Sequence, residues 1–216
     1  MSDVTPDRAE VLPWERRSEM DLEKAFAKTV AAFLHPRNAW AATPESGGYA
    51  GPLLFAALCG ALGALFTATY DLMLFQWMLR RNPTLRSANV PWLTGRSILP
   101  LSKLNILISP IVNGVVVTLM VFVVAAIIHA GVVLVGARKR STSGFEGTFR
   151  VAAYGSAGLM GQAVPLLGSL LAFVWCLVLA VTGVARMHRI SIGKTVAALI
   201  LPFAILLAVM FAFTSR

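Results

Sequence analysis

The chain has 216 residues, of which 57% are hydrophobic and only 13% charged, and its formal net charge is +9. This composition excludes an ordinary soluble domain, in which about a quarter of the residues are charged. The basic residues lie beside apolar segments rather than on a face with interleaved aromatic residues. They therefore indicate membrane topology and contact with the lipid bilayer, and not nucleic-acid binding.

The first fifty residues form the polar part of the chain, with six basic and eight acidic residues. They lack the basic start and apolar core of a signal peptide, so the first membrane helix is expected to act as the insertion signal. We expect residues 1–20 to be a disordered cytoplasmic tail. Residues 21–42 are predicted as a juxtamembrane amphipathic helix that either lies on the membrane surface or packs as a cap on the membrane domain. Its apolar face comprises Leu22, Phe26, Val30, Phe33 and Leu34.

Five apolar runs predict five transmembrane spans, because a spanning helix needs about 20 mostly apolar residues. The spans cover residues 51–79, 106–135, 149–164, 165–185 and 193–214. As one helix the stretch 151–185 would reach about 52 Å, against a hydrocarbon core of about 30 Å, so Pro165 is interpreted as the turn of a tight hairpin. A re-entrant loop in its first half is the alternative. The predicted fold class is an all-α membrane protein, a five-helix bundle preceded by the juxtamembrane helix.

The basic residues of the short loops predict the orientation. With the N-terminus in the cytoplasm and the C-terminus outside, thirteen basic residues lie on the inner side and six on the outer side. Five of those six lie in the segment 80–105, which contains three prolines and is predicted as an irregular external loop.

Asp71 is the one acidic residue inside a predicted span, and an intramembrane charge is a functional candidate by default. The favoured interpretation is that Asp71 lies near the outer end of its helix and anchors the loop by pairing with Arg80, Arg81 or Arg86. His129, in the second span, is interpreted as a hydrogen-bonded structural histidine. His188 is placed at a helix end near the membrane interface.

No complete catalytic constellation is found in the sequence. Ser156 lies in a Gly-Ser-Ala-Gly sequence, whereas intramembrane serine proteases need Gly-x-Ser-Gly and a histidine on a facing span. Cys59 and Cys176 have no neighbouring ligand at metal spacing. We therefore expect no enzyme activity, no catalytic residue, no cofactor and no metal.

Two stripes of small residues recur at four-residue spacing, and such stripes let helices approach closely. They are Ala56, Gly60 and Ala64 in the first span, and Ala153, Ala157 and Gly161 in the third. We interpret them as packing within the bundle, with a homo-oligomer contact as the alternative.

A capping box is predicted at Ser143-x-x-Glu146, at the start of the third span. Glu146 and Arg150 are spaced to pair at i, i+4 along the same helix.

An ordered set of short motifs resembles a known family. Pro13-Trp14-Glu15-Arg16-Arg17 precedes the juxtamembrane helix, His35-Pro36 closes it, Tyr49-Ala50-Gly51-Pro52 opens the first span, and Phe149-Arg-Val-Ala-Ala-Tyr154-Gly155-Ser156 opens the third. Over about residues 13–213 the chain resembles the Ypt-interacting-protein (Yip) domain family of integral membrane proteins, in its bacterial branch. Tyr49, Gly51 and Pro52 match that family's Asp-Leu-Tyr-Gly-Pro block, with Gly47-Gly48 in place of Asp-Leu and Ala50 inserted. Tyr154 and Gly155 match its Gly-Tyr element loosely.

The resemblance implies an integral protein of the bacterial inner membrane, and in eukaryotic members it implies membrane trafficking with Rab-type GTPase partners. The favoured function is a non-enzymatic interaction or membrane-organising module with an unidentified membrane or cytoplasmic protein partner. The alternative is a small transporter, permease or channel component. Transport requires polar residues of different spans to converge at midplane depth, whereas a scaffold leaves them scattered. The residues in question are Asp71, Gln76, Asn113 and His129.

Overall fold

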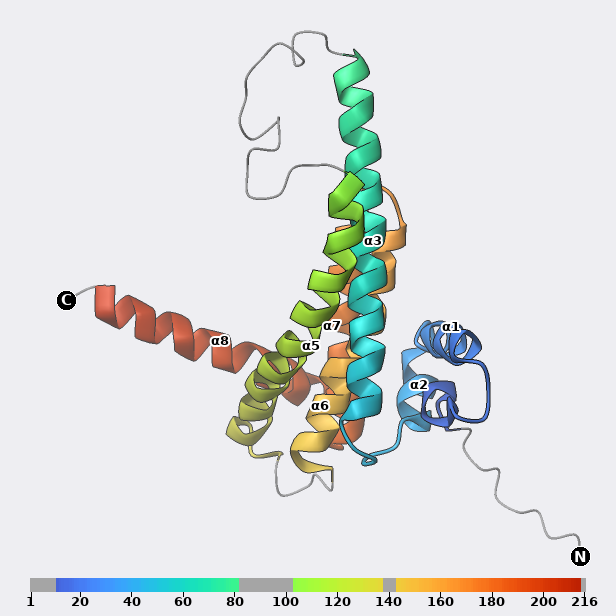
Figure 1. The fold of residues 1–216 in the computed structure, drawn as a ribbon. Coiled ribbons are helices and arrows are strands. Elements are labelled where there is room, and N and C mark those ends of the chain that lie inside the picture. Colours follow the sequence, from blue (N-terminus) through green and yellow to red (C-terminus); the bar gives the residue numbers. More distant parts are fainter. Residues whose placement is uncertain (1–10, 82–102, 138–142, 215–216) are drawn as a thin grey trace, which may run out of the picture.

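A computed structural model describes residues 11–81, 103–137 and 143–214 (Figure 1). Every regular element within these residues is helical, so the all-α fold class is confirmed. The α-helices are α1 (Leu22–Ala32), α2 (Pro36–Ala42), α3 (Ala50–Arg81), α5 (Lys103–Leu134), α6 (Gly144–Gly155), α7 (Gly168–Met187) and α8 (Ile192–Thr214). Two 3-10 helices complete the set, η1 (Pro13–Arg16) and η3 (Ser156–Ala163).

The longest helices, α3 and α5, pack side by side in opposite directions (Figure 1). The stripe of small residues on α3 lies in this contact. Ala56 is fully buried, and a Cβ atom on Gly60 would lie 2.6 Å from Cγ2 of Val117. Small residues here allow the two backbones to approach closely, which is how membrane helices associate without a hydrophobic driving force.

The chain reverses direction at the predicted Pro165 turn. From Gly155 the α6 helix continues as the 3-10 helix η3, and the reversal places Leu166 at a positive φ of 65°. η3 then packs along α7, where a Cβ atom on Gly158 would lie 2.6 Å from the backbone nitrogen of Cys176. Gly161 of the second small-residue stripe also lies inside this hairpin, where a Cβ atom would lie 2.8 Å from the backbone nitrogen of Ala172, whereas Ala153 belongs to a buried cluster shared with α3 and α5.

Three described helical segments are long and apolar enough to cross a membrane: Ala50–Met78, Ile106–Leu134 and Gly168–Met187, with mean hydropathy of 1.8, 2.8 and 2.2. The other two predicted spans look different in the structure. The 149–164 span is divided between α6 and η3, and the apolar part described for α8 is the shorter segment Ile192–Ile205. Five spans therefore stay a prediction.

Helix α8 crosses α5 at one point and then leaves the bundle (Figure 1). At the crossing, Gly131 of α5 lies against the carbonyl oxygen of Ala198, where any Cβ atom would overlap it. Pro202 also lies close to Gly131.

The segment before the first span folds as a layer beside one end of the bundle, comprising η1, α1 and α2 (Figure 1), and we call it the N-terminal layer. Where the sequence predicted one helix over 21–42, the chain forms two, because it turns at Phe33–His35 before Pro36 begins α2. Ala25, Thr29 and Phe33 are buried, whereas Leu22 and Leu34 remain exposed. Part of the predicted apolar face therefore packs against the protein.

Candidate interaction site

Trp14 fixes the start of the N-terminal layer to α3. Its indole is fully buried, and Nε1 donates a hydrogen bond of 2.7 Å to the carbonyl oxygen of Gly51. Its backbone N–H donates to Oγ1 of Thr29, 2.9 Å away. The indole also makes edge contacts with Phe26 and Phe55, at centroid distances of 6.2 and 5.5 Å. The prediction of disorder for residues 1–20 is therefore wrong for residues 11–20, while residues 1–10 lie outside the described chain.

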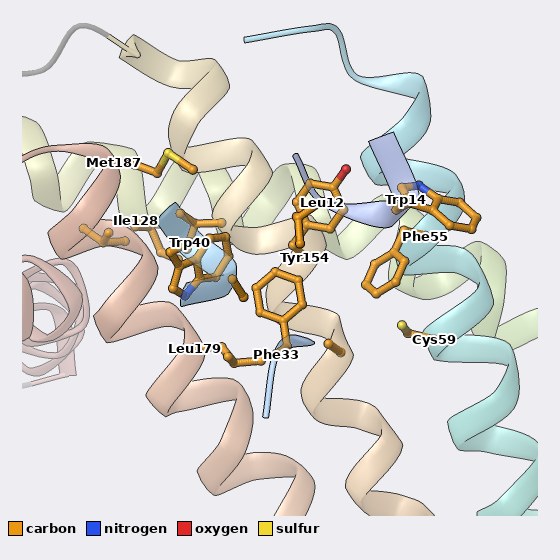
Figure 2. Close-up of a cluster of buried hydrophobic side chains, with 14 of the residues drawn as sticks. Leu12, Trp14, Phe33, Trp40, Phe55, Cys59, Ile128, Tyr154, Leu179 and Met187 are labelled. Atoms are coloured by element: carbon orange, nitrogen blue, oxygen red, sulfur yellow. The ribbon is translucent and has the colours of Figure 1, made fainter. Parts of the chain in front are cut away.

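Tyr154 lies between Phe55 of α3 and Phe33 of the N-terminal layer, as Figure 2 shows. Its ring lies 5.3 Å from that of Phe55 on one side and 6.0 Å from that of Phe33 on the other. The centroid of the Phe33 ring lies 4.9 Å from that of Trp40. Nε1 of Trp40 in turn donates a hydrogen bond of 3.1 Å to Oγ1 of Thr182 on α7. The layer is thus anchored to α3, α6 and α7 together.

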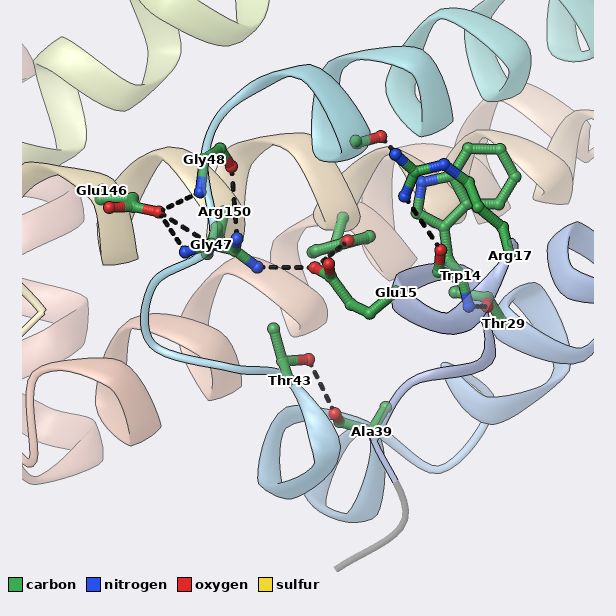
Figure 3. Close-up of polar contacts among 12 residues, drawn as sticks. Trp14, Glu15, Arg17, Thr29, Ala39, Thr43, Gly47, Gly48, Glu146 and Arg150 are labelled. Atoms are coloured by element: carbon green, nitrogen blue, oxygen red, sulfur yellow. Dashed lines mark hydrogen bonds and ion pairs between the residues drawn. The ribbon is translucent and has the colours of Figure 1, made fainter. Parts of the chain in front are cut away.

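A buried ion pair lies at the centre of this contact (Figure 3). Nη1 of Arg150 is 2.6 Å from Oε1 of Glu15, and the Tyr154 hydroxyl donates to the same oxygen at 2.5 Å. The Arg150 side chain is 0% exposed and that of Glu15 is 14% exposed. Because an unpaired buried charge is very costly, Arg150 requires this carboxylate, which comes from a segment 135 residues earlier in the chain.

Glu146 holds the connection between α2 and α3 (Figure 3). Its Oε1 accepts hydrogen bonds of 2.8 Å from the backbone N–H groups of both Gly47 and Gly48, and it lies 3.4 Å from Nε of Arg150. Nη2 of Arg150 donates to the carbonyl oxygen of Gly48 at 3.2 Å. The two glycines have φ values of 140° and 86°, which other residues rarely adopt.

The surroundings of Glu146 favour its charged form. Partial burial acts to raise the pKa of this carboxyl, but the hydrogen bonds from Gly48 and Gly47 and the nearby Arg150 guanidinium outweigh it and lower the pKa. The predicted i, i+4 pair between Glu146 and Arg150 is therefore present. The predicted capping box is wrong, because the Ser143 hydroxyl donates instead to the carbonyl oxygen of Met187, 3.0 Å away, and caps no N–H of α6.

The other motif residues surround the same contact. The Tyr49 ring meets that of Phe149 edge-on at 4.7 Å, and Pro52 is buried in the first turn of α3. Gly51 is also buried, and a Cβ atom there would lie 2.9 Å from Nη1 of Arg17. Gly155 is buried where α6 gives way to η3, although a Cβ atom there would meet nothing within 4 Å.

A histidine cluster lies beside this contact. Oγ1 of Thr148 is 3.1 Å from Nδ1 of His129 and 2.8 Å from Nε2 of His188, so one hydroxyl serves both rings. His188 lies at the C-terminal end of α7, as predicted, and its side chain is fully buried. Burial, and to a lesser degree the nearby His129, lowers the pKa of His188 to about 4. No local sequence pattern indicates this cluster, since the three residues come from different helices.

The polar residues considered for a transport path lie apart. Asp71 is exposed at the far end of α3, the backbone of Asn113 meets Gly60 near the middle of α3, and His129 lies beside α6. The predicted pairing of Asp71 with Arg80 or Arg81 is not formed, because nine or ten residues of α-helix separate the groups by about 14 Å or more. Arg86 lies outside the described residues.

The described residues support neither a catalytic role for Ser156 nor a metal site. The Ser156 hydroxyl donates to the carbonyl oxygen of Ala153, 2.6 Å away in its own helix. No group of three or more His, Cys, Asp or Glu side chains is placed to hold a metal among residues 11–81, 103–137 and 143–214.

Comparison with known proteins agrees with the architecture. Neither the curated proteins nor the solved structures include a match to this chain. The sequence pattern of the Yip1 domain matches residues 30–213, which include α2, every membrane helix and the Glu146–Arg150–Tyr154 side of the contact. The chain is a membrane protein that belongs to the Yip1 domain family.

Proposed function

We propose that this protein is a non-enzymatic module that organises interactions at a membrane, and that the N-terminal layer is the part that meets its protein partner. The observation that supports this function is the pairing of Glu15 with Arg150 and Tyr154. The polar groups gathered there satisfy one another and hold the layer in place, so they are not available for reaction with a substrate.

The layer offers a surface for a partner because part of its apolar side chains face outward. Leu22 and Leu34, at the two ends of α1, are 50% and 63% exposed. Apolar side chains that remain exposed are available for contact with a protein or a membrane. A second copy of this chain, a cytoplasmic protein and another membrane protein are all partners of the proposed kind.

We further propose that the protein lies in the inner membrane of a bacterium with the N-terminal layer in the cytoplasm and the C-terminus outside. The thirteen to six distribution of basic residues supports this orientation. The alternative function in transport is not favoured, because Asp71, Asn113 and His129 do not gather at one depth.

Site-specific photo-crosslinking in native membranes tests the proposed interaction surface. A photoreactive residue at Leu34 should give a discrete adduct, and one at Leu166, which is 88% exposed at the opposite end of the bundle, serves as the control. The Leu34 adduct should weaken when Glu15→Gln loosens the layer. Equal adducts at both positions, or a Leu34 adduct insensitive to Glu15→Gln, would contradict the proposal.

A further inference from the structure

A groove of about 640 Å³ lies between α3 and the turn from η3 to α7. This turn is at the end of the hairpin away from the N-terminal layer (Figure 1). Polar side chains from both sides line it: Thr67, Tyr70, Asp71, Gln162 and Ser169. Apolar side chains, among them Leu74 and Leu166, complete its walls. A largely apolar groove that carries a few polar side chains suits an amphiphilic ligand.

The groove is built by close contacts between α3 and η3. The Tyr70 hydroxyl donates a hydrogen bond of 2.7 Å to the carbonyl oxygen of Ala163, the last residue of η3. The Gln162 amide oxygen lies against Gly63, where a Cβ atom would overlap it. Tyr70 and Asp71 follow Gly63 by seven and eight residues, which is about two helical turns. One face of α3 therefore carries the polar side chains that this helix contributes to the groove.

The length of α3 allows Asp71 to lie at the level of the lipid headgroups if Gly51 lies at the opposite boundary of the bilayer. Asp71 follows Gly51 by 20 residues, and a helix of that length rises about 30 Å, the thickness of the hydrocarbon core. Gly51 is the residue on which Trp14 of the N-terminal layer is anchored. With Gly51 at one boundary of the bilayer, Asp71 therefore lies at the other.

The Asp71 carboxylate is exposed, and none of the described residues forms an ion pair or hydrogen bond with it. Arg80 is too far along the same helix, at about 14 Å. A carboxylate beside hydrocarbon is costly unless a cation or water accompanies it. Among the described residues, therefore, no cation complements the charge of Asp71 in the groove.

We propose that this groove binds the headgroup of a phospholipid that carries a primary ammonium group, such as phosphatidylethanolamine, from the leaflet opposite the N-terminal layer. A primary ammonium has three N–H donors, and the groove offers the Asp71 carboxylate, the Gln162 amide and the Ser169 hydroxyl as acceptors. Leu74 and Leu166, 45% and 88% exposed, provide apolar surface for the acyl chains. A quaternary ammonium has the same charge but no N–H group, so it should bind less well.

A series of lipids with identical acyl chains tests the number of N–H donors. Retention by the purified full-length protein is measured by native mass spectrometry for phosphatidylethanolamine, its N-methyl and N,N-dimethyl forms, and phosphatidylcholine. Retention should fall with each methyl group, to about tenfold weaker for phosphatidylcholine. Tenfold corresponds to about 1.4 kcal/mol, close to one hydrogen bond to a charged group.

Two variants locate the site. Asp71→Asn should abolish the discrimination between the four lipids, and Ser169→Ala should reduce it. Asp21→Asn is the matched control, because Asp21 is an exposed carboxylate on the N-terminal layer that pairs with Lys24, and this variant should discriminate as the wild type does.

Equal retention of all four lipids by the wild type would overturn the proposal, since it would show a general lipid shell. Unchanged discrimination in Asp71→Asn would place the selective site elsewhere and would equally overturn it. If Asp71→Asn does not fold, the methylation series with Ser169→Ala decides in its place. Displacement of phosphatidylethanolamine by soluble phosphoethanolamine alone would show that the acyl chains add nothing and would refute the lipid as the ligand.

Discussion

Glu15→Gln is the sharpest test of how the N-terminal layer is held. Gln keeps the size of the side chain and one carbonyl oxygen, so it can still accept from Arg150 and Tyr154, but the negative charge 2.6 Å from the Arg150 guanidinium is lost. Arg150 retains Glu146 at 3.4 Å and the Gly48 carbonyl oxygen at 3.2 Å. The positive charge of Arg150 is therefore less well compensated in Glu15→Gln, but it is not left without a partner.

The expected cost lies below that of a fully broken buried pair. Removing one partner of such a pair costs about 3–5 kcal/mol, and a hydrogen bond to a charged group contributes about 1.5–3 kcal/mol. Because Glu146 still faces the guanidinium, we expect about 2 kcal/mol. The energy is lost from docking of the layer rather than from the bundle, so it appears as local opening. At 1.4 kcal/mol per tenfold change, opening becomes about 30 times more frequent.

Hydrogen exchange of the protein in lipid nanodiscs measures this opening segment by segment. Amides of residues 11–42 should exchange about 30 times faster in Glu15→Gln, while those of α5 and α7 should not change. Glu19→Gln is the matched control, because Glu19 pairs with Arg16 at the surface, where both side chains are more than half exposed. Such pairs contribute little, so that variant should exchange as the wild type does.

Equal protection of residues 11–42 in Glu15→Gln and Glu19→Gln would refute the reasoning, because it would show that the buried pair adds nothing to docking. Faster exchange in α5 and α7 as well would also refute it, since the pair would then support the whole bundle rather than the layer.

Three further predictions concern pH, backbone and topology. The free energy of unfolding should fall as pH drops from about 6.5 to about 4, because the unfolded chain protonates His188 in this range and the folded protein does not. A series of thermal unfolding measurements should show a full loss of about 3 kcal/mol, and His188→Gln should abolish this pH dependence. Gly47→Ala should destabilise docking by about 1–3 kcal/mol, measured by the same hydrogen exchange, since its φ is 140° and the new Cβ would lie 2.7 Å from Nη2 of Arg150; no effect would contradict the geometry. A reporter active only in the cytoplasm should work at Met1 and fail at Arg216, and activity at both ends would mean an even number of spans.

Much of the bundle could be predicted from single segments of sequence. Long apolar runs predicted α3, α5 and α7, since the length and composition of a spanning helix are local properties. The small-residue stripes predicted close packing for the same reason, and Gly60 against Val117 bears this out. The Yip resemblance rested on motifs that the family match includes, apart from Pro13–Arg17, which lies before residue 30.

The N-terminal layer could not be predicted from local patterns, because its stability comes from distant partners. Residues 11–20 are rich in charge and short of apolar periodicity, which is typical of a disordered tail. They are ordered because Trp14 enters a site made by α3, and Glu15 meets a guanidinium on α6. The motif Pro13–Arg17 was visible, but nothing nearby in the sequence indicated its partner.

Side-chain partners at helix ends failed for a related reason. The Ser143 and Glu146 spacing satisfied the rule for a capping box, yet each side chain found a stronger partner from another segment, Met187 for the serine and Gly47-Gly48 for the glutamate. No spacing rule relates His129 to His188, because the two residues belong to different helices. Thr148, whose hydroxyl contacts both rings, could not be identified from the sequence, since a lone threonine in an apolar helix is ordinary.

Glu146 and His188 affect the stability of the fold in different pH ranges. Glu146 has a pKa below its ordinary 4.5, so its contribution to folding is present above about pH 4.5 and is lost only below that. His188 has a pKa lowered from 6.5 to about 4, so its contribution is already being lost as pH falls below 6.5. Between pH 6.5 and 4.5 the free energy of unfolding therefore falls because the unfolded chain protonates His188, while the carboxylate that holds Gly47 and Gly48 keeps its charge. In this range acid therefore lowers the free energy of unfolding through His188 before it acts on the carboxylate that helps to hold the N-terminal layer.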